Sequence, residues 1–281
     1  MPNKNILIGI VDNPDMSYES EISRRKPGLF IFLVDQSRSM SKKISGGTHS
    51  KAQEAADAIN RQLNEIISRC TKSDGVRPYF DVGVIGYGYK SGDATGLISD
   101  QPIPINELES HILRMEKKTE KIDGEDIEIE FPVWFDPVAS YDTPMVKGLT
   151  IAKQWIDDWV QRNPDSFPPV LINISDGGAT DGNPKDVAEQ IMEIETSDGK
   201  TLIWNCHISE KNEKSVSFPR DESEVPEEKH AREMFEMSSV IPDSMLAIAK
   251  EEYQNVDTGA RAYVYNANLE DLIRLLDIGT R

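Results

Sequence analysis

Three shortages limit what this 281-residue chain can be. It has two cysteines, Cys70 and Cys206, too few for a disulfide framework or a thiolate metal cluster, so we expect two buried free thiols. No apolar run is long enough to cross a membrane. Basic residues are scarce, since 31 Lys and Arg stand against 49 Asp and Glu for a net charge of −18. That charge argues against a general nucleic-acid binder and against a protein bound to an anionic membrane.

The amino terminus lacks a basic segment followed by a long apolar core. We therefore expect no signal peptide and a cytoplasmic location. Residues 1–27 are mixed in character, with a short apolar stretch at residues 5–10 that suits an edge strand, and we expect them to form an N-terminal arm. Residues 28–281 show no repeat, no low-complexity tract and no linker, so we expect a single domain there.

Strand-like and helix-like segments alternate along that domain. Apolar runs occur at residues 29–34, 79–87, 170–175, 201–208 and 262–265, and helical periodicity or helix signals at residues 50–69, 144–162, 184–196, 230–237, 243–252 and 269–276. The first run has no polar residue, which is typical of a parallel strand buried on both faces. The order predicts an α/β fold with a doubly wound, Rossmann-like, mainly parallel sheet flanked by helices. Proline-containing pieces in residues 88–110 predict a short antiparallel edge strand.

Two charged regions lie outside this alternation. Residues 111–135 are acidic, and the apolar–polar alternation at residues 127–131 with a turn-like Asp123-Gly124 predicts a two-stranded excursion with one solvated face. Residues 209–228 lack apolar periodicity and are expected to form an exposed loop. Solvation explains the charges of both regions, and contact with a partner is the alternative.

A polar turn directly follows the first strand. Asp35, Ser37 and Ser39 place oxygen-bearing side chains at alternate positions beyond its carboxyl end. That edge is where open α/β sheets bind ligands. A carboxylate with two hydroxyls is a hard-oxygen set suited to Mg²⁺, which keeps several waters and takes few protein ligands. The alternative is an ordinary strand-to-helix turn in which a serine caps the next helix.

Two further oxygen donors occur later in the chain. Thr143 before Pro144 fits a helix N-cap followed by the first helical residue, and Asp176 ends the strand at residues 170–175. Such positions converge on one edge of a doubly wound sheet. We therefore expect an octahedral Mg²⁺ site formed by Asp35, Ser37, Ser39, Thr143 and Asp176. A hydroxyl-rich shell would leave the ion electrophilic toward an incoming carboxylate.

The motifs around these residues resemble the von Willebrand factor A (vWA) domains, with their metal-ion-dependent adhesion site (MIDAS). Residues 35–40, DQSRSM, are similar to the DxSxSM of that site, residues 141–145, YDTPM, to GGTPM, and residues 175–182, SDGGATDG, to (T/S)DGxPTDG. The resemblance covers about residues 28–276. Within the family, the sequence is similar in particular to the bacterial, tellurium-resistance-associated TerY-like group. Gln36 and Tyr141-Asp142 depart from the family pattern, as does the length of the acidic insertion. Asp142 either adds a carboxylate near the metal or caps the helix together with Thr143.

The resemblance implies roles for the five residues. Ser37, Ser39 and Thr143 would bind Mg²⁺ directly, with Mn²⁺ as an alternative metal, while Asp35 and Asp176 would act partly through water. A Glu or Asp of a protein partner would complete the shell. TerY-like proteins are often encoded beside a Ser/Thr kinase and a PP2C-type phosphatase, which are the implied partners. The implied setting is a bacterial stress-response, tellurium-resistance or defence signalling system.

Two other functional classes compete with a binding module. A metal-assisted phosphotransferase or hydrolase with Asp35 as phosphoryl acceptor would need a second acid where Ser37 stands. The chain also lacks a P-loop and a Gly-x-Gly-x-x-Gly after a strand, and His207 lies in a strand-like run, where a structural role is the simpler interpretation. We therefore expect no enzymatic activity. A scaffold with a purely structural metal is the third class, in which the metal changes melting but not partner binding.

Overall fold

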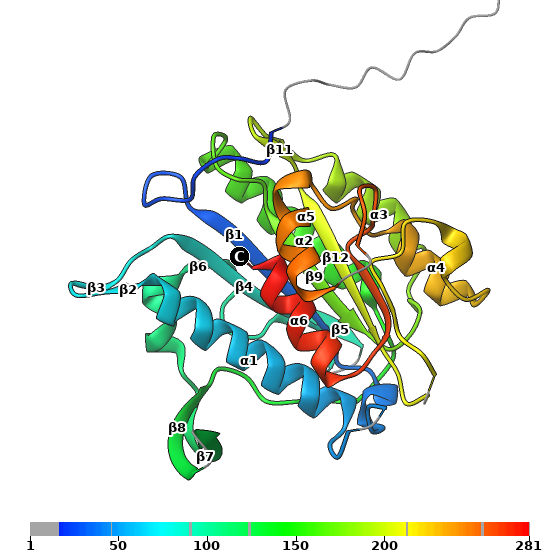
Figure 1. The fold of residues 1–281 in the computed structure, drawn as a ribbon, viewed down its shortest axis with the longest axis horizontal. Helices are drawn as coiled ribbons and strands as arrows, with labels where there is room; N and C mark the ends of the chain where they lie inside the picture. The colour runs from blue at the N-terminus through cyan, green and yellow to red at the C-terminus, as the bar shows by residue number, and fades with distance from the viewer. Residues whose placement is uncertain are drawn as a thin grey trace, which may run out of the picture.

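The computed structural model describes residues 17–45, 47–89, 92–122, 125–211, 213–253 and 256–280, without the side chains of residues 118–127. The described residues form an eight-stranded sheet in the order β13-β14-β12-β9-β1-β4-β5, with β6 also paired to β4 (Figure 1). Its strands are β1 Gly28–Asp35, β4 Phe80–Tyr89, β5 Asp93–Gly96, β6 Ile103–Pro104, β9 Val170–Ser175, β12 Leu202–Ile208, β13 Val216–Ser217 and β14 Tyr263–Ala267. The five central strands are parallel, and β13, β5 and β6 pair antiparallel at the edges. The predicted α/β fold is confirmed.

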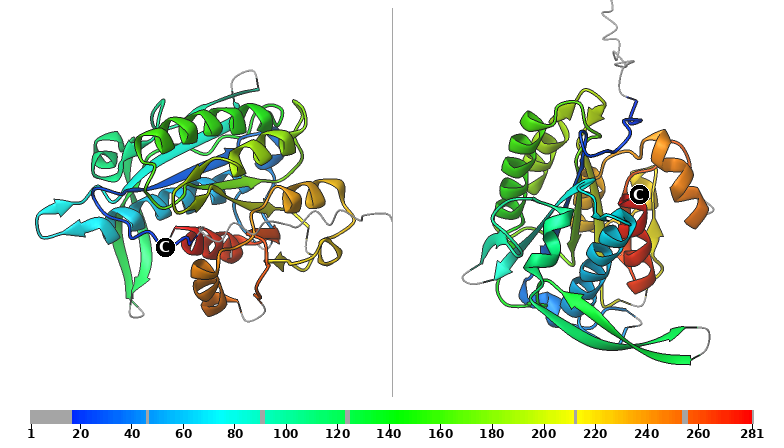
Figure 2. Two further views of the ribbon diagram at one scale, coloured as in Figure 1. Left: turned by 90° about the horizontal axis from the view of Figure 1, so that it is seen from above. Right: turned by 90° about the vertical axis from the view of Figure 1, so that its left-hand side faces the viewer.

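Helices cover both faces of this sheet (Figure 2). On one face lie α1 Lys51–Cys70, α5 Asp243–Glu252 and α6 Leu269–Gly279. On the other face lie α2 Met145–Arg162, α3 Pro184–Met192 and α4 Lys229–Glu236. Short elements complete the described part: η1 Arg38–Ser41, η2 Ile105–His111, η3 Glu222–Glu224 and the hairpins β2 Thr71–Lys72 with β3 Gly75–Val76 and β10 Glu195–Thr196 with β11 Gly199–Lys200. None of the helices in these ranges has the length and apolar character that a membrane span requires.

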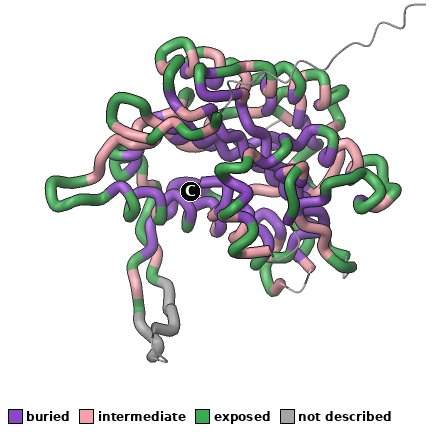
Figure 3. The backbone as a smooth tube through the Cα atoms, turned by 45° about the horizontal axis from the view of Figure 1, so that its top comes forward, coloured by how far each residue is buried: buried purple, intermediate pink, exposed green. Residues whose placement is uncertain are grey.

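Strand β1 contributes side chains to both halves of the core, which lies at the centre of the molecule (Figure 3). Phe30 and Phe32 pack into the cluster that contains α1 and α6. Leu29 and Ile31 point to the opposite face and pack with α2. Each such side chain, fully buried, stabilises the fold by roughly 1.5–3 kcal/mol relative to its exposed state. The continuous apolar run is therefore explained by burial on two faces.

The strand order reverses at β1. From β1 the chain forms β4 on one side and later β9 on the other, and both neighbours are parallel to β1. In doubly wound sheets, ligands bind at such a reversal, outside the carboxyl ends of the strands. Here the register pairs Val34 with Ile174, so Asp35 and Ser175 are neighbours across the reversal.

Two features of residues 184–228 differ from the expectations. Helix α3 ends at Met192 instead of about residue 196, because the following residues form the β10–β11 hairpin. Residues 209–228 are not a wholly exposed loop. They include β13, which pairs with β14, and the buried side chains of Phe218 and Val225. Val216, Phe218 and Val225 are too few and too unevenly spaced in this charged stretch to give a periodic signal of burial.

The acidic insertion forms the hairpin of β7 Arg114–Ile122 and β8 Glu125–Val133, as expected for a two-stranded excursion (Figure 2). Its predicted turn at residues 123–124 lies outside the described residues. Glu116 and Glu128 pair with Arg114 and Lys117 at exposed positions, which agrees with a solvated surface. The hairpin projects from the body on the side away from α3 and α4 (Figure 1).

The described part of the N-terminal arm lies against the domain. Asp198 accepts hydrogen bonds from the Ser17 hydroxyl and from the amides of Glu19 and Ser20. The Tyr18 amide donates to the Asp198 carbonyl at 3.0 Å. The edge strand expected at residues 5–10 lies outside the described residues.

A buried polar ladder crosses the core just below the carboxyl edge of the sheet. The Tyr87 hydroxyl donates to Asn173 Oδ1 at 3.1 Å, Asn173 Nδ2 donates to Asn205 Oδ1 at 2.9 Å, and Asn205 Nδ2 donates to the Ser238 hydroxyl at 3.0 Å. These bonds satisfy polar groups that could not be buried unpaired without a penalty.

We predict that Asn173→Leu lowers the free energy of unfolding by about 2–4 kcal/mol, because it leaves the Tyr87 hydroxyl and Asn205 Oδ1 buried without these partners. Tyr87→Phe is the control, since it removes one bond together with its donor and should lower the free energy by about 1 kcal/mol. Urea denaturation of the three proteins measures both changes. Equal losses in the two variants would contradict a shared ladder centred on Asn173.

Candidate metal site

Asp35 ends β1 and its carboxylate is buried, with 1% of the residue exposed. Oδ1 accepts a hydrogen bond from the Ser37 amide at 2.8 Å, and Oδ2 accepts one from the Ser175 hydroxyl at 2.7 Å. Burial first, and then the nearby Asp176 carboxylate, raise the pKa of Asp35 to about 6. The fold thus places a negative charge where water cannot fully solvate it.

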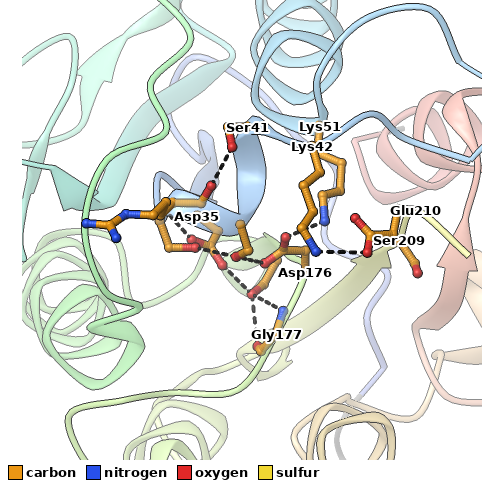
Figure 4. Close-up of polar contacts among 12 residues, drawn as sticks. Asp35, Ser41, Lys42, Lys51, Asp176, Gly177, Ser209 and Glu210 are labelled. Atoms are coloured by element: carbon orange, nitrogen blue, oxygen red, sulfur yellow. Dashed lines mark hydrogen bonds and ion pairs between the residues drawn. The ribbon is translucent and has the colours of Figure 1, made fainter.

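Four of the five expected residues form one hydrogen-bonded group. The Ser37 and Ser39 hydroxyl oxygens lie 3.0 Å apart, and the Ser39 hydroxyl donates to Asp176 Oδ1 at 2.7 Å. Asp35 joins this group through the Ser37 amide. Figure 4 shows Asp35 and Asp176 facing the same small region between the end of β1 and the end of β9. The turn after β1 therefore meets the turn after β9, as the strand order requires.

Thr143 lies on a neighbouring segment. The residues before it run alongside the turn after β1, since the Arg38 amide donates to the Tyr141 carbonyl at 2.8 Å and the Ser140 amide donates to the Gln36 carbonyl at 2.8 Å. Thr143 is buried, and its own amide donates to the Thr180 hydroxyl at 3.1 Å. Within the described residues, no hydrogen bond joins its side chain to the other four residues. The structure thus brings its segment to the turn without linking its hydroxyl directly.

Gly88 of β4 makes the approach of these segments feasible. It has a φ of +107°, which a residue with a side chain rarely adopts. A Cβ atom there would lie 2.6 Å from the Asp142 carbonyl oxygen and 2.8 Å from the Ser37 amide nitrogen. A glycine is therefore needed where three backbone segments meet beside the site.

The expected cap of the following helix is wrong. Helix α2 begins at Met145, Pro144 occupies the N-cap position, and no side chain of that residue caps it. The carboxylate of Asp181 accepts hydrogen bonds from the amides of Val146 and Lys147 at 3.1 and 3.0 Å. Neither Thr143 nor the exposed Asp142 has the capping role. A distant carboxylate replaces them because the turn after β9 reaches the helix N-terminus, which favours negative charge.

Lys51, at the start of α1, lies against the same group. Its Nζ is 2.5 Å from Asp176 Oδ2, and the two side chains are 4% and 1% exposed. In Figure 4 the Lys51 side chain extends toward Asp176, and the Lys42 side chain reaches Glu210. The two buried carboxylates thus have one buried ammonium as a partner.

The donor set fits a hard divalent cation. Two carboxylates and three hydroxyls are oxygen ligands of the kind that Mg²⁺ and Mn²⁺ accept. Burial and the neighbouring Asp176 carboxylate raise the pKa of Asp35, and the two carboxylates share one buried ammonium, that of Lys51. In the described ranges no three His, Cys, Asp or Glu side chains are grouped to hold a metal, so this hydroxyl-rich set is of a different type.

The other expectations on reactive side chains concern His207 and the cysteines. His207 stacks on Tyr265 with ring centroids 4.7 Å apart, and its Nδ1 accepts a hydrogen bond from the Asn266 amide at 3.2 Å. Burial lowers the pKa of His207 to about 4, so the ring is neutral near pH 7. Cys70 and Cys206 are buried free thiols, as expected. These contacts agree with structural roles for all three residues.

Sequence reasoning missed three residues that support the group: Lys51, Ser175 and Asp181. Ser175 and Asp181 belong to the quoted SDGGATDG segment, so their proximity to Asp176 was a usable signal. For Lys51 the signal is its place in the first turn of a predicted helix, where the helix dipole disfavours a cation. Such a lysine needs a nearby anion, but the sequence does not say which one.

Comparison with known proteins gives structural neighbours alone. No protein-family model matches the chain, and no curated protein matches it. The pilus adhesin SpaC from Lactobacillus rhamnosus GG, in an open conformation, is 13% identical, with a TM-score of 0.50 over 92% of this chain and 30% of that chain. The vWF domain of the type V pili tip protein Mfa5 from Porphyromonas gingivalis is 13% identical, with a TM-score of 0.32 over 55% of this chain and 39% of that chain. The chain therefore spans well under half the length of either structure.

The match to SpaC concerns the fold alone, given its low identity. It agrees with a mixed α/β, vWA-like and Rossmann-like arrangement, in which helices flank a mainly parallel sheet. The expected fold is thereby supported, and membership of the vWA family stays a prediction. The metal site and the TerY-like assignment stay predictions.

We predict that Asp35→Asn stabilises the metal-free protein at pH 7 by up to about 3 kcal/mol. The pKa of Asp35 rises from 3.8 to about 6 on folding, and each unit is worth about 1.4 kcal/mol. Because the folded state holds this proton more tightly, wild-type stability from this group is lost as the pH rises from about 4 to 6. Urea denaturation in EDTA should therefore show a larger advantage for the variant at pH 7 than at pH 5. A variant no more stable than the wild type at pH 7 would refute the prediction.

Proposed function

We propose that this chain is a metal-dependent protein-binding module. Asp35, Ser37, Ser39, Thr143 and Asp176 would hold Mg²⁺ or Mn²⁺, and an acidic residue of a partner protein would complete the shell. The observation that supports this most is the hydrogen-bonded group that joins the ends of β1 and β9 at the reversal of the strand order. A bound ion would supply a positive charge that a carboxylate can reach.

The protein's own contacts support this choice of function. Both Asp35 oxygens accept hydrogen bonds, from the Ser37 amide and from the Ser175 hydroxyl, which fixes the carboxylate. Ser39 is exposed, so the group opens to solvent on that side. A fixed inner carboxylate with an exposed hydroxyl suits the presentation of a cation to an external ligand.

We also propose the finer assignment that the motifs suggest. The segments DQSRSM, YDTPM and SDGGATDG support a MIDAS of the bacterial TerY-like group. The partner would then be a Ser/Thr kinase or a PP2C-type phosphatase in a cytoplasmic stress-response, tellurium-resistance or defence system. The metal-assisted phosphotransferase or hydrolase is the competing class. Metal-dependent phosphoester turnover that disappears in Asp35→Ala would favour it over a binding module.

The metal should stabilise the protein through the five residues. At a concentration of MgCl₂ 100 times the dissociation constant, the free energy of unfolding should rise by about 2.7 kcal/mol. Melting curves in MgCl₂ and in EDTA should differ for the wild type. They should also differ for the control Ser41→Ala, because the Ser41 hydroxyl donates to the Arg38 carbonyl and is not one of the five donors. They should coincide for Ser37→Ala and Thr143→Ala. A full shift in Thr143→Ala would remove that residue from the ligand set.

Partner binding should require the same metal. A protein captured on the immobilised chain in MgCl₂ should be released by EDTA and should not bind Asp35→Ala, while Ser41→Ala should behave as the wild type. The physical reason is that the partner's carboxylate has no cation to bind once the metal is absent. Capture that persists in EDTA and in Asp35→Ala would refute the proposal. Metal-dependent melting with metal-independent capture would instead identify a structural ion.

A further inference from the structure

We infer that Lys51 is a built-in counter-ion that weakens metal binding until an acidic ligand is present, so that metal and ligand bind together. This inference rests on the proposed function and concerns how the same site is regulated. It follows from the position of Lys51, from its burial and from the charges around Asp176.

Lys51 is fixed by the backbone at the first position of α1. Its amide donates to the Lys42 carbonyl at 2.8 Å, and the preceding Ser50 caps the helix by accepting from the Gln53 amide at 3.2 Å. The side chain is 4% exposed, and Nζ lies 2.5 Å from Asp176 Oδ2. Its anchored backbone and buried side chain keep the ammonium next to Asp176.

A lysine at this place is unfavourable by itself. The N-terminus of a helix carries partial positive charge, which disfavours a cation in the first turn. Lysine is also rarely buried without an ionic partner. Both effects are offset here by Asp176, whose other oxygen accepts from Ser39. The Lys51 ammonium therefore lies within the candidate metal site and not on the solvent-exposed surface of the helix.

The charges at the site then favour a third acid. Asp35 and Asp176 contribute two negative charges and Lys51 one positive charge, which leaves one negative charge for a divalent ion. Once the ion is bound, the buried group carries one positive charge in excess, and the carboxylate of an external ligand removes that excess. Without Lys51, the two carboxylates would neutralise the ion by themselves. Metal would then bind more tightly and would depend less on the ligand.

Lys42 provides a natural comparison. Glu210 first, and the Asp176 carboxylate to a lesser extent, raise the pKa of Lys42. Its side chain, however, is 58% exposed and pairs with Glu210 at 2.8 Å. Solvent and this partner screen its charge from the site. Removing Lys42 should therefore change metal binding little.

The experiment is calorimetric titration of MgCl₂ into the full chain, in sodium chloride and in sodium acetate of equal ionic strength, with acetate as the carboxylate probe. In chloride, Lys51→Met should bind Mg²⁺ about tenfold more tightly than the wild type, because a nearby buried positive charge is gone. Acetate should strengthen binding in the wild type and strengthen it less in Lys51→Met. Lys42→Met should behave as the wild type, and Lys51→Arg, which keeps the charge, should bind Mg²⁺ less tightly than Lys51→Met.

Melting provides an independent readout that also checks folding. Lys51→Met leaves two carboxylates without their ammonium, so it should melt at a lower temperature in EDTA and gain more from MgCl₂ than the wild type does. If the wild type binds Mg²⁺ and a folded Lys51→Met binds it no more tightly, the role of Lys51 is overturned while the proposed metal site stands. Absence of Mg²⁺ binding from both proteins would overturn the proposed metal site and this inference with it.

Discussion

The candidate site depends on one constraint, the burial of the Asp35 carboxylate at the end of a strand that is itself buried on both faces. Helices on both sides of β1 exclude water from the end of the strand. The remaining hydrogen-bond donors are the Ser37 amide and the Ser175 hydroxyl. They hold the carboxylate without cancelling its charge, which its raised pKa reflects. A carboxylate in such a position is stabilised by a neighbouring positive charge.

The reversal of the strand order brings further oxygen-bearing side chains next to the Asp35 carboxylate. Because β4 and β9 flank β1, the turn after β9 brings Asp176 beside the turn after β1 and Asp181 to the start of α2. The positive φ of Gly88 lets the segment before Thr143 approach the same turn. The side chains therefore owe their proximity to backbone packing, and the hydrogen bonds among them only refine it.

The charges of the candidate site come from a helix and from the edge of the sheet. Helix α1 supplies the Lys51 ammonium from one face, while the turn after β9 supplies Asp176. In a chain with a net charge of −18, a local balance this close to neutrality is set by neighbours and not by composition. Surface pairs such as Lys42 with Glu210 contribute little to it, since solvent screens them.

The sequence by itself determined the order of elements, the parallel sheet and the edge at which polar residues gather, because hydrophobic periodicity and turn residues are local signals. It also identified Asp35, Ser37, Ser39 and Asp176, which the structure joins by hydrogen bonds. Only the tertiary structure decided that Lys51 pairs with Asp176 and that Asp181, not Thr143, caps α2. Those contacts join residues more than thirty positions apart, and they depend on side-chain geometry that no local pattern encodes.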